Sequence, residues 1–196
     1  MTSMPPSAIR VYIFKEGECG DKTSDTRIYT CVVRFLEAEG SDADTRFLSG
    51  VRPAIARAFG KKPRFDPGVG LYFSVSHSRA FWVCAVSGQE VGIDLQKKAD
   101  KFNHGIVKRF FHPDERRYLE DNGFGDFFMI WAAKESYVKF TGLGIDDGFS
   151  AFSSVRDGRI GPCINDAEIR FLPFDPEYVL CLCAREIGET PNIEFA

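Results

Sequence analysis

The feature that most constrains the fold is a set of short apolar segments separated by turn residues. The segments have the length of strands, and they lie at 71–76 (LYFSVS), 81–86 (FWVCAV), 91–96 (VGIDLQ), 167–174 (AEIRFLPF) and 178–186 (YVLCLCARE). Turn-forming residues separate neighbouring segments, as in Ser87-Gly88 and Asp175-Pro176. Strands joined by short turns pair antiparallel. The sequence therefore predicts a largely antiparallel sheet.

Segments with helical spacing interrupt these strands. Apolar residues recur every three or four positions at 25–38 and at 44–59, although Pro53 should kink or split the second of these helices. Two further helices are expected from Pro113 to Asn122 and from Asp126 to Thr141. Strands are also expected at 9–14 and 148–155, and the tail after Gly188 is expected to be loose. This irregular order of helices and strands favours an α+β fold.

Composition limits the function classes. With 196 residues, 44% of them hydrophobic, the chain can form one sizeable domain or two small halves that pack directly. The formal net charge of −3 gives no overall basic field, which argues against nucleic acid as a partner. We find no signal-peptide pattern and no run of about 18 apolar residues, so we expect a cytoplasmic protein without membrane contact. The six cysteines lack metal-site spacing and are expected to be reduced.

A glutamate within the apolar stripe of the helix 127–140 (FFMIWAAKESYVKF) is the first candidate for chemistry. At about 100° per residue, Glu135 falls about 40° from Trp131, inside the stripe. A buried carboxylate needs a cation, hydrogen-bond donors or a raised pKa. Lys134 and Lys139 flank the stripe, so the helix is predicted to present Lys, Glu and Lys to one site. The alternative is an exposed Glu135–Lys139 pair at a helix edge.

Asp94 is the second candidate. Alternation along the strand 91–96 places Gly92, Asp94 and Gln96 on one face. Because Gly92 has no side chain, a bulky group can approach the backbone beside Asp94. The alternative is an aspartate at a strand end that caps a turn.

Two further features favour an anionic ligand. Ser76-His77-Ser78 groups several hydrogen-bond donors after a strand, as phosphate oxygens require, although a lone histidine is more often structural. Basic residues are concentrated in two stretches, with six Lys or Arg against one acid from Asp44 to Arg64, and seven against three acids from Lys97 to Arg117. Such stretches attract polyanions, although solvated charged faces are equally common.

The order of these motifs resembles one enzyme family. The succession SHS (76–78), GID (92–94) and WAAKESYVK (131–139) resembles the 4′-phosphopantetheinyl transferase superfamily. The GKKP, SVSHS and KRFF elements resemble its larger, surfactin-synthetase-activating type. The resemblance covers residues 60–144 well and the rest of the chain in outline.

The resemblance implies a fold and an activity. The expected fold is two similar α+β halves that form a pseudo-dimer in one chain, with residues 1–88 binding the adenosine and phosphate end of coenzyme A and residues 89–196 holding the metal site and docking the carrier protein. These enzymes transfer 4′-phosphopantetheine from coenzyme A to a serine of an acyl or peptidyl carrier protein in fatty-acid, polyketide or nonribosomal peptide biosynthesis. They release 3′,5′-ADP and require Mg²⁺, with Mn²⁺ as an alternative. A monomer is expected.

Site residues follow by position. The resemblance implies that Asp94, Glu135 and Lys139 are catalytic and that Asp94 and Glu135 bind the metal. Gln96 stands at a third metal position, where many bacterial members have glutamate. The region after Lys97, including Phe110-Phe111, would dock the carrier. The residues implied to bind coenzyme A are Arg46, Lys61, Lys62, Arg64, Ser76, His77, Lys134 and Lys139.

Other functions fit less well. A non-catalytic module that binds coenzyme A or a carrier protein is the alternative, because Gln96 removes one charge from the metal site. The chain has no G-x-x-x-x-G-K-[ST] loop of an NTPase and no G-x-S-x-G motif of a serine hydrolase.

Overall fold

The computed structural model describes residues 8–17, 23–40, 53–57, 62–144, 147–189 and 191–196. Its strands and helices follow in the order β1 (Ile9–Lys15), α1 (Ser24–Ala38), η2 (Pro67–Val69), β2 (Tyr72–Ser78), β3 (Phe81–Ser87), β4 (Val91–Lys97), α3 (His104–Phe110), α4 (Pro113–Asp121), α5 (Phe127–Thr141), η3 (Asp147–Ser150), β5 (Val155–Arg156), β6 (Arg159–Ile160), β7 (Cys163–Ile164), β8 (Ala167–Leu172), β9 (Tyr178–Ala184) and β10 (Asn192–Phe195). The predicted α+β class is confirmed.

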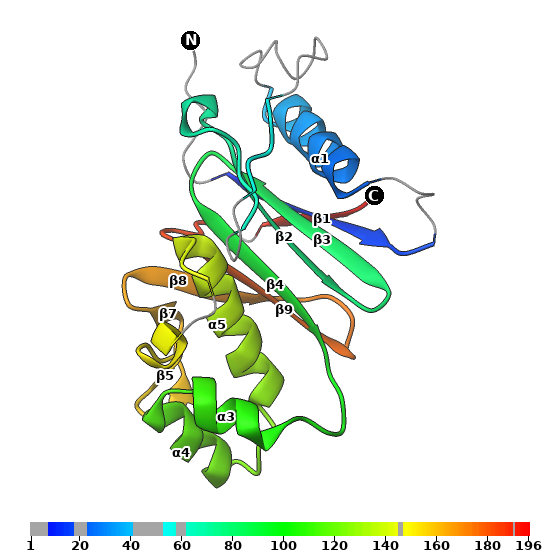
Figure 1. The fold of residues 1–196 in the computed structure, drawn as a ribbon. Helices are drawn as coiled ribbons and strands as arrows, with labels where there is room; N and C mark the ends of the chain where they lie inside the picture. Colours follow the sequence, from blue (N-terminus) through cyan, green and yellow to red (C-terminus); the bar gives the residue numbers. More distant parts are fainter. Residues whose placement is uncertain (1–7, 18–22, 41–52, 58–61, 145–146, 190) are drawn as a thin grey trace.

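The first sheet has the strand order β10-β1-β3-β2, and α1 covers one of its faces (Figure 1). Helix α1 begins after Thr23, whose side chain accepts a hydrogen bond from the Thr26 amide. Its buried residues, which recur with helical spacing, are Arg27, Ile28, Cys31, Val32, Phe35 and Leu36. These residues pack on the side chains of β1 and β3 that alternate toward the helix, among them Phe14 and Trp82.

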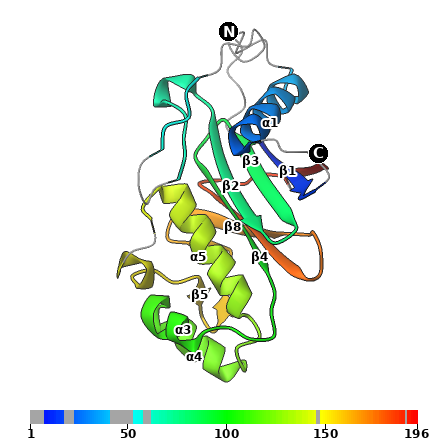
Figure 2. The ribbon, with the colours of Figure 1, turned by 45° about the vertical axis from the view of Figure 1, so that its right-hand side comes forward.

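The second sheet has the order β4-β9-β8-β7, and α5 lies across one of its faces, as the turned view in Figure 2 shows. Ala132, Ala133 and Tyr137 of α5 pack against Val179, Cys181 and Cys183 of β9. The opposite face of this sheet carries Ile93, Leu95 and Leu182, which pack on Val11, Val83 and Ala85 of the first sheet. The molecule is therefore layered as α1, first sheet, second sheet and α5.

Helices α3 and α4 form a smaller cluster at the start of α5 (Figure 1). Phe111 and Leu119 are fully buried against Ile130. Helix α4 starts with a capping box: the His112 side chain accepts from the Asp114 amide, and Glu115 accepts from the His112 amide at 2.9 Å. The predicted start of this helix at Pro113 is confirmed.

Three local predictions are wrong where the structure describes them. Residues 53–57 of the expected helix 44–59 are not helical, because Pro53 cannot donate a helical hydrogen bond. Ala56 instead pairs with Arg64 in an isolated antiparallel bridge. Residues 44–52, 58 and 59 lie outside the described residues. The expected strand 148–155 contains the short helix η3, and only its last residue belongs to β5. The tail after Gly188 is not loose throughout, since β10 pairs in parallel with β1.

Strand β10 also qualifies the expected division of the chain at residues 88 and 89. The two sheets do separate there, between β3 and β4. However, β10 crosses back to the first sheet, and Ile193 packs on the core between the sheets. The C-terminal half as predicted therefore contributes one strand to the sheet of the N-terminal half.

Candidate active site

Asp94 lies in the middle of β4, on the face toward α5, as the alternation of the strand predicts. Its side chain is only 3% exposed, and both carboxylate oxygens accept hydrogen bonds. Ser76 and Lys139 donate to Oδ1 at 2.8 and 2.6 Å, and Nε2 of Gln96 donates to Oδ2 at 2.7 Å. These donors compensate for the loss of water around a buried carboxylate.

Glu135 lies on α5 close enough to Asp94 for the two charges to interact. Burial, with the negative charge of Asp94 as a second cause, raises the pKa of Glu135 to about 7, and Lys139 acts in the opposite direction. Among the residues that the structure describes, none donates a hydrogen bond to this carboxylate. Glu135 is therefore a half-buried acid beside Asp94 whose oxygens accept no hydrogen bond from any residue within the described ranges.

Lys139 joins the helix to the strand. Its Nζ donates to Asp94 Oδ1 and to the Ile93 carbonyl at 3.1 Å, and its side chain remains 22% exposed. The expected alternative, an exposed Glu135–Lys139 pair at a helix edge, is not what the structure contains. Lys139 is instead paired with Asp94, and its positive charge also acts on Glu135.

Gly92 explains how the two elements come so close. A Cβ atom added at Gly92 would lie 1.9 Å from the Ser136 carbonyl oxygen and 2.5 Å from the Phe140 nitrogen. Only glycine allows the backbone of α5 to rest on β4 at this point. The sequence predicted a close approach at Gly92, and the group that approaches is helix α5 itself.

Ser76 fixes Asp94 from the other sheet. Alternate serines of β2 accept hydrogen bonds from amides of β4, through the pairs Ser74 with Ile93, Ser76 with Leu95 and Ser78 with Lys97, at 3.1, 3.2 and 3.0 Å. Ser76 additionally donates to Asp94. This serine ladder joins the edges of the two sheets and orients the aspartate.

The donor set of the site suits a hard divalent cation. Two carboxylates and the carbonyl oxygen of the Gln96 amide are oxygen ligands of the kind that Mg²⁺ prefers, together with water and substrate phosphates. The described residues contain no group of three or more His, Cys, Asp or Glu side chains arranged for a metal. A site with two carboxylates fits the residues present, whereas a site with three acids does not.

The predicted role of Lys134 is contradicted. Lys134 is fully buried and forms an ion pair at 3.0 Å with Glu115, which is equally buried, and it donates to the Phe152 carbonyl at 2.7 Å. Burial lowers its pKa. Because Lys134 and Lys139 are five positions apart on a helix, they point in directions about 140° apart. Lys134 therefore lies inside the C-terminal half, where a phosphate has no access to it.

Ser76 and His77 do not point to the same side. They are consecutive residues of β2, so their side chains lie on opposite faces of the strand. His77 is exposed, and its charge helps to lower the pKa of Glu16, after the stronger effect of Arg27. The predicted cluster of donors is thus divided between the two faces.

Lys62 and Arg64 line a hollow of about 250 Å³ between the halves. Ala56 and Arg57 line it together with Glu90 on one side, and the end of α5 with Gly142 and Leu143 lines the other. Arg46 and Lys61, which were predicted to bind the same ligand, lie outside the described residues.

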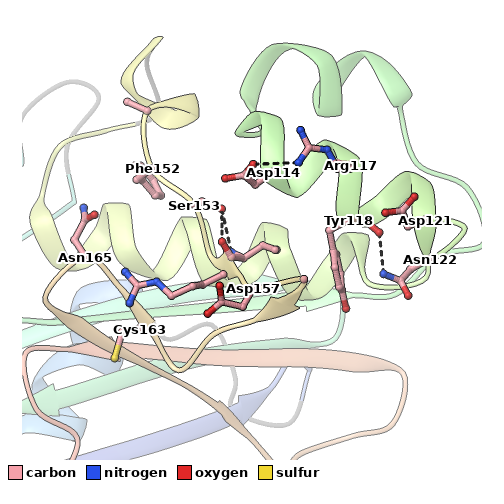
Figure 3. Close-up of a pocket in the computed structure, with 14 residues that line it drawn as sticks. Asp114, Arg117, Tyr118, Asp121, Asn122, Phe152, Ser153, Asp157, Cys163 and Asn165 are labelled. Carbon is pink, nitrogen blue, oxygen red and sulfur yellow. Dashed lines mark hydrogen bonds and ion pairs between the residues drawn. The ribbon is translucent and has the colours of Figure 1, made fainter.

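A larger hollow of about 640 Å³ lies elsewhere, between α4, the segment after η3 and the β5–β6 hairpin (Figure 3). Arg117 and Asp114 form an ion pair along α4 on one side of it, and Asp157 and Cys163 lie on the other side (Figure 3). None of the predicted site residues lines it. Its size alone does not make it the active site, because the acids with interacting charges lie beside β4.

Sequence reasoning missed two charged residues that the structure connects to predicted ones. Glu115 pairs with Lys134, and Glu90 pairs with Lys62 at 2.7 Å. A glutamate at the third position of a helix that begins with proline signals a capping box, and this signal was available for Glu115. No local pattern indicated Glu90.

Comparison with known proteins identifies relatives. Residues 90–183 match the family model of the 4′-phosphopantetheinyl transferase superfamily. A Bacillus subtilis protein named 4′-phosphopantetheinyl transferase is 32% identical over 169 residues, which cover 74% of this chain and 75% of the relative. The 4′-phosphopantetheinyl transferase psf-1 of Bacillus pumilus is 31% identical over 63% of this chain and 57% of its own length. Among the described residues, no helix has the length and apolar character needed to cross a bilayer.

Proposed function

Because this chain belongs to the 4′-phosphopantetheinyl transferase superfamily, we propose that Asp94 and Glu135 form its catalytic centre. The chain is a 4′-phosphopantetheinyl transferase, which moves the phosphopantetheine group of coenzyme A to a carrier protein. The observation that carries the proposal is that a strand and a helix bring two acids together with one lysine, so that burial and the neighbouring acid raise the pKa of Glu135 to about 7.

The metal proposed for this centre is Mg²⁺, with Mn²⁺ as an alternative. Asp94 and Glu135 would hold it, and the Gln96 carbonyl oxygen would reach it if the amide turned, because the amide nitrogen now faces Asp94. When bound, such a cation neutralises charge on the diphosphate of coenzyme A and on the leaving group. The oxygens of Glu135, which accept no hydrogen bond from the described residues, support this assignment.

Glu135 is also proposed to take the proton of the attacking serine. A general base works best when its pKa is close to the working pH, and in the metal-free protein burial and the neighbouring Asp94 raise the pKa of Glu135 to about 7. The serine oxygen would then attack the β-phosphate of coenzyme A, and the bond from that phosphorus to the oxygen bridging to the α-phosphate would break. The leaving group would be 3′,5′-ADP.

Lys139 is proposed to hold the reacting phosphate oxygens. Its ammonium group lies beside Asp94 and is partly exposed, so it can exchange a hydrogen bond with the protein for one with the ligand. Positioning and fixed charges supply most of the rate in phosphoryl transfer. Ser76 would act by orienting Asp94.

The nucleotide end of coenzyme A is proposed to bind in the hollow at Lys62 and Arg64, because this hollow lies between the halves and is lined by several cations. Arg46, Lys61 and His77 remain predicted contacts. Two lysines at the end of β4, its last residue Lys97 and the following Lys98, together with the exposed positions of α3, support the docking of an acidic carrier protein on this side.

The proposed pseudo-dimer has topological support. The first half contains β1, α1, β2 and β3 in chain order, and the second contains β4, α5, β8 and β9 in chain order with further elements between them. In both sheets these strands are arranged as first, third and second: β1-β3-β2 and β4-β9-β8. All neighbours in these two sets pair antiparallel. We also propose a monomer in the cytoplasm, since one chain contributes both halves.

The transfer assay tests the proposal. The protein is incubated with coenzyme A, Mg²⁺ and several apo carrier proteins, and mass spectrometry detects the phosphopantetheine adduct and 3′,5′-ADP. Asp94→Ala and Glu135→Ala should each abolish transfer, whereas Asp166→Ala, which changes an exposed aspartate between β7 and β8, serves as control. Full activity of either site variant would remove that residue from the centre. Binding of coenzyme A without any adduct would instead favour a non-catalytic module.

A further inference from the structure

An ion pair between Lys62 and Glu90 lines the hollow of about 250 Å³ beside the end of α5. Nζ of Lys62 donates to Oε2 of Glu90 at 2.7 Å and to the Val91 carbonyl at 3.1 Å. The Lys62 side chain is only 11% exposed, whereas that of Glu90 is 47% exposed. The lysine is therefore fixed and buried, and the glutamate is the member that can swing into solvent.

The pair also stands between two hollows. Lys62, Arg64 and Glu90 line the hollow of about 250 Å³ and also a smaller one of about 30 Å³, whose further walls include Phe65, Tyr72 and Phe73. A group that replaced the Glu90 carboxylate at Lys62 would contact both. The position of Glu90, directly before β4, gives it a short connection to the strand of Asp94.

The other charges around the pair are mainly positive. Arg57 and Arg64 line the hollow of about 250 Å³. Arg57 forms an ion pair with Asp25 of α1, and the positive charge of Arg64 disfavours the charged form of Lys62. Burial lowers the pKa of Lys62, and Glu90 opposes this shift. Among the described residues that line the hollow of about 250 Å³, Glu90 is the only acid. The ammonium of Lys62 thus depends on Glu90 for a counter-charge until another anion arrives.

We propose that Glu90 is an internal counter-anion that a phosphate group of the co-substrate must displace from Lys62. Glu90 would thereby limit the affinity of the hollow for nucleotide phosphates, which have the charge and the acceptor oxygens to take its place. This inference rests on the proposed function, because it takes coenzyme A as the ligand. It adds a residue that sets affinity without touching the reacting atoms.

The direction of the effect follows from this competition. In the wild-type protein, binding includes the loss of the Lys62–Glu90 pair and the repulsion between Glu90 and the phosphate. The pair has one buried and one half-exposed member, and its contribution is modest because the exposed member is screened by solvent. Glu90→Gln should therefore bind coenzyme A about three- to fivefold more tightly.

Calorimetric titration at pH 7.5 and low salt tests this proposal. Coenzyme A and dephospho-coenzyme A are titrated into the wild-type protein, Glu90→Gln, Lys62→Met and the double variant. Glu177→Gln is the matched control, since Glu177 also pairs with a lysine, Lys97, at 2.8 Å and its loss removes the same charge outside the hollow. The gain should appear in Glu90→Gln, vanish in the double variant and stay below about twofold in Glu177→Gln.

The outcomes distinguish the role of Glu90 from the proposed function. A gain with coenzyme A that is lost with dephospho-coenzyme A places the 3′-phosphate at Lys62, and an equal gain with both ligands places the diphosphate there; either supports the role of Glu90. Unchanged or weaker binding by a folded Glu90→Gln, or an equal gain in Glu177→Gln, overturns it. Coenzyme A binding by the wild type without transfer overturns only the proposed function.

Discussion

Three donors hold the Asp94 carboxylate: the Ser76 hydroxyl, the Lys139 ammonium and the Gln96 amide. A cation can reach Asp94 at the second lone pair of Oδ2, beside the Gln96 amide, or by replacing one of the donors. Gln96 is the donor whose replacement costs least, because its side chain is neutral and half-buried and can turn its carbonyl oxygen toward the cation. The metal affinity of the site should therefore depend on the residue at position 96.

The variant Gln96→Glu tests this dependence. A third carboxylate adds one negative charge beside a divalent cation, so the Mg²⁺ dissociation constant and the Mg²⁺ concentration for half-maximal transfer should both fall about tenfold. Calorimetry and a rate titration measure the two quantities. Asn192→Asp introduces the same charge at an exposed position of β10 and should change neither. An unchanged metal titration for Gln96→Glu would place Gln96 away from the metal.

The raised pKa of Glu135 predicts a pH-dependent stability of the metal-free protein. A carboxyl group that titrates near 7 in the folded state and near 4.5 in the unfolded state contributes stability that is present below about 4.5 and is lost as the pH rises through about 7. In EDTA, the wild type should therefore lose about 2 kcal/mol of unfolding free energy relative to Glu135→Gln between pH 5 and pH 8. Denaturant unfolding of both proteins measures this difference, and a constant difference would contradict the shifted pKa.

At the scale of elements, the position of α5 decides whether a site exists. Its two lysines fasten it on different sides, Lys139 to Asp94 on β4 and Lys134 to Glu115 on α4. Glu115 also accepts from the Ser154 amide and hydroxyl at 2.8 and 2.9 Å. A buried ion pair with its hydrogen bonds satisfied contributes little net stability but fixes geometry, since the loss of one partner leaves a buried charge.

Gly92→Ala should separate α5 from β4. The added methyl group overlaps the Ser136 carbonyl, and a backbone contact cannot move without the helix. We expect a loss of about 3 kcal/mol in unfolding free energy and a larger fractional loss of transfer activity, because Asp94 and Glu135 move apart. Gly125→Ala is the control, since its methyl would lie 3.6 Å from the Asn122 carbonyl, an ordinary contact. Equal behaviour of the two variants in both assays would argue against the close approach as the cause.

At the scale of the whole molecule, three connections hold the halves together. The apolar core between the sheets contributes most of the buried surface. The serine ladder joins β2 to β4, and β10 returns from the second sheet to pair with β1. Because the proposed ligand lies between the halves, their relative position sets the distance from the cationic hollow to the two acids.

Removal of residues 192–196 should loosen this arrangement. The deletion exposes the edge of β1 and removes the contact of Ile193 with the core and of Phe195 with Phe174. We expect a loss of about 2 kcal/mol in unfolding free energy and concentration-dependent association through the free edge. Thermal unfolding and light scattering measure both. Glu194→Gln, which removes only the ion pair with Arg10, should cost less than about 1 kcal/mol. Unaltered melting after the deletion would show that β10 does not hold the halves.

Local patterns predicted most helices and strands. The strands β2, β3, β4, β8 and β9 and the helices α1, α4 and α5 lie where apolar periodicity and turn residues indicated. Two predictions failed for physical reasons. Residues 53–57 are not helical despite their apolar spacing, because Pro53 disfavours a helix there. Strand β10 pairs with the edge of β1, which is distant in sequence, so no local pattern predicted it. Local patterns also predicted that Asp94 and Glu135 lie on inward faces and that another group approaches the backbone at Gly92.

The fold class, the family and the inward placement of Asp94 and Glu135 could be predicted from short segments of the chain, because periodicity, glycine placement and ordered motifs are properties of neighbouring residues. The pairing of Lys134 with Glu115 and the pairing of Lys62 with Glu90 arise only in the folded molecule. Each pair joins side chains that are far apart in the sequence. Local sequence patterns carry no information on which distant residue will lie within ion-pair distance.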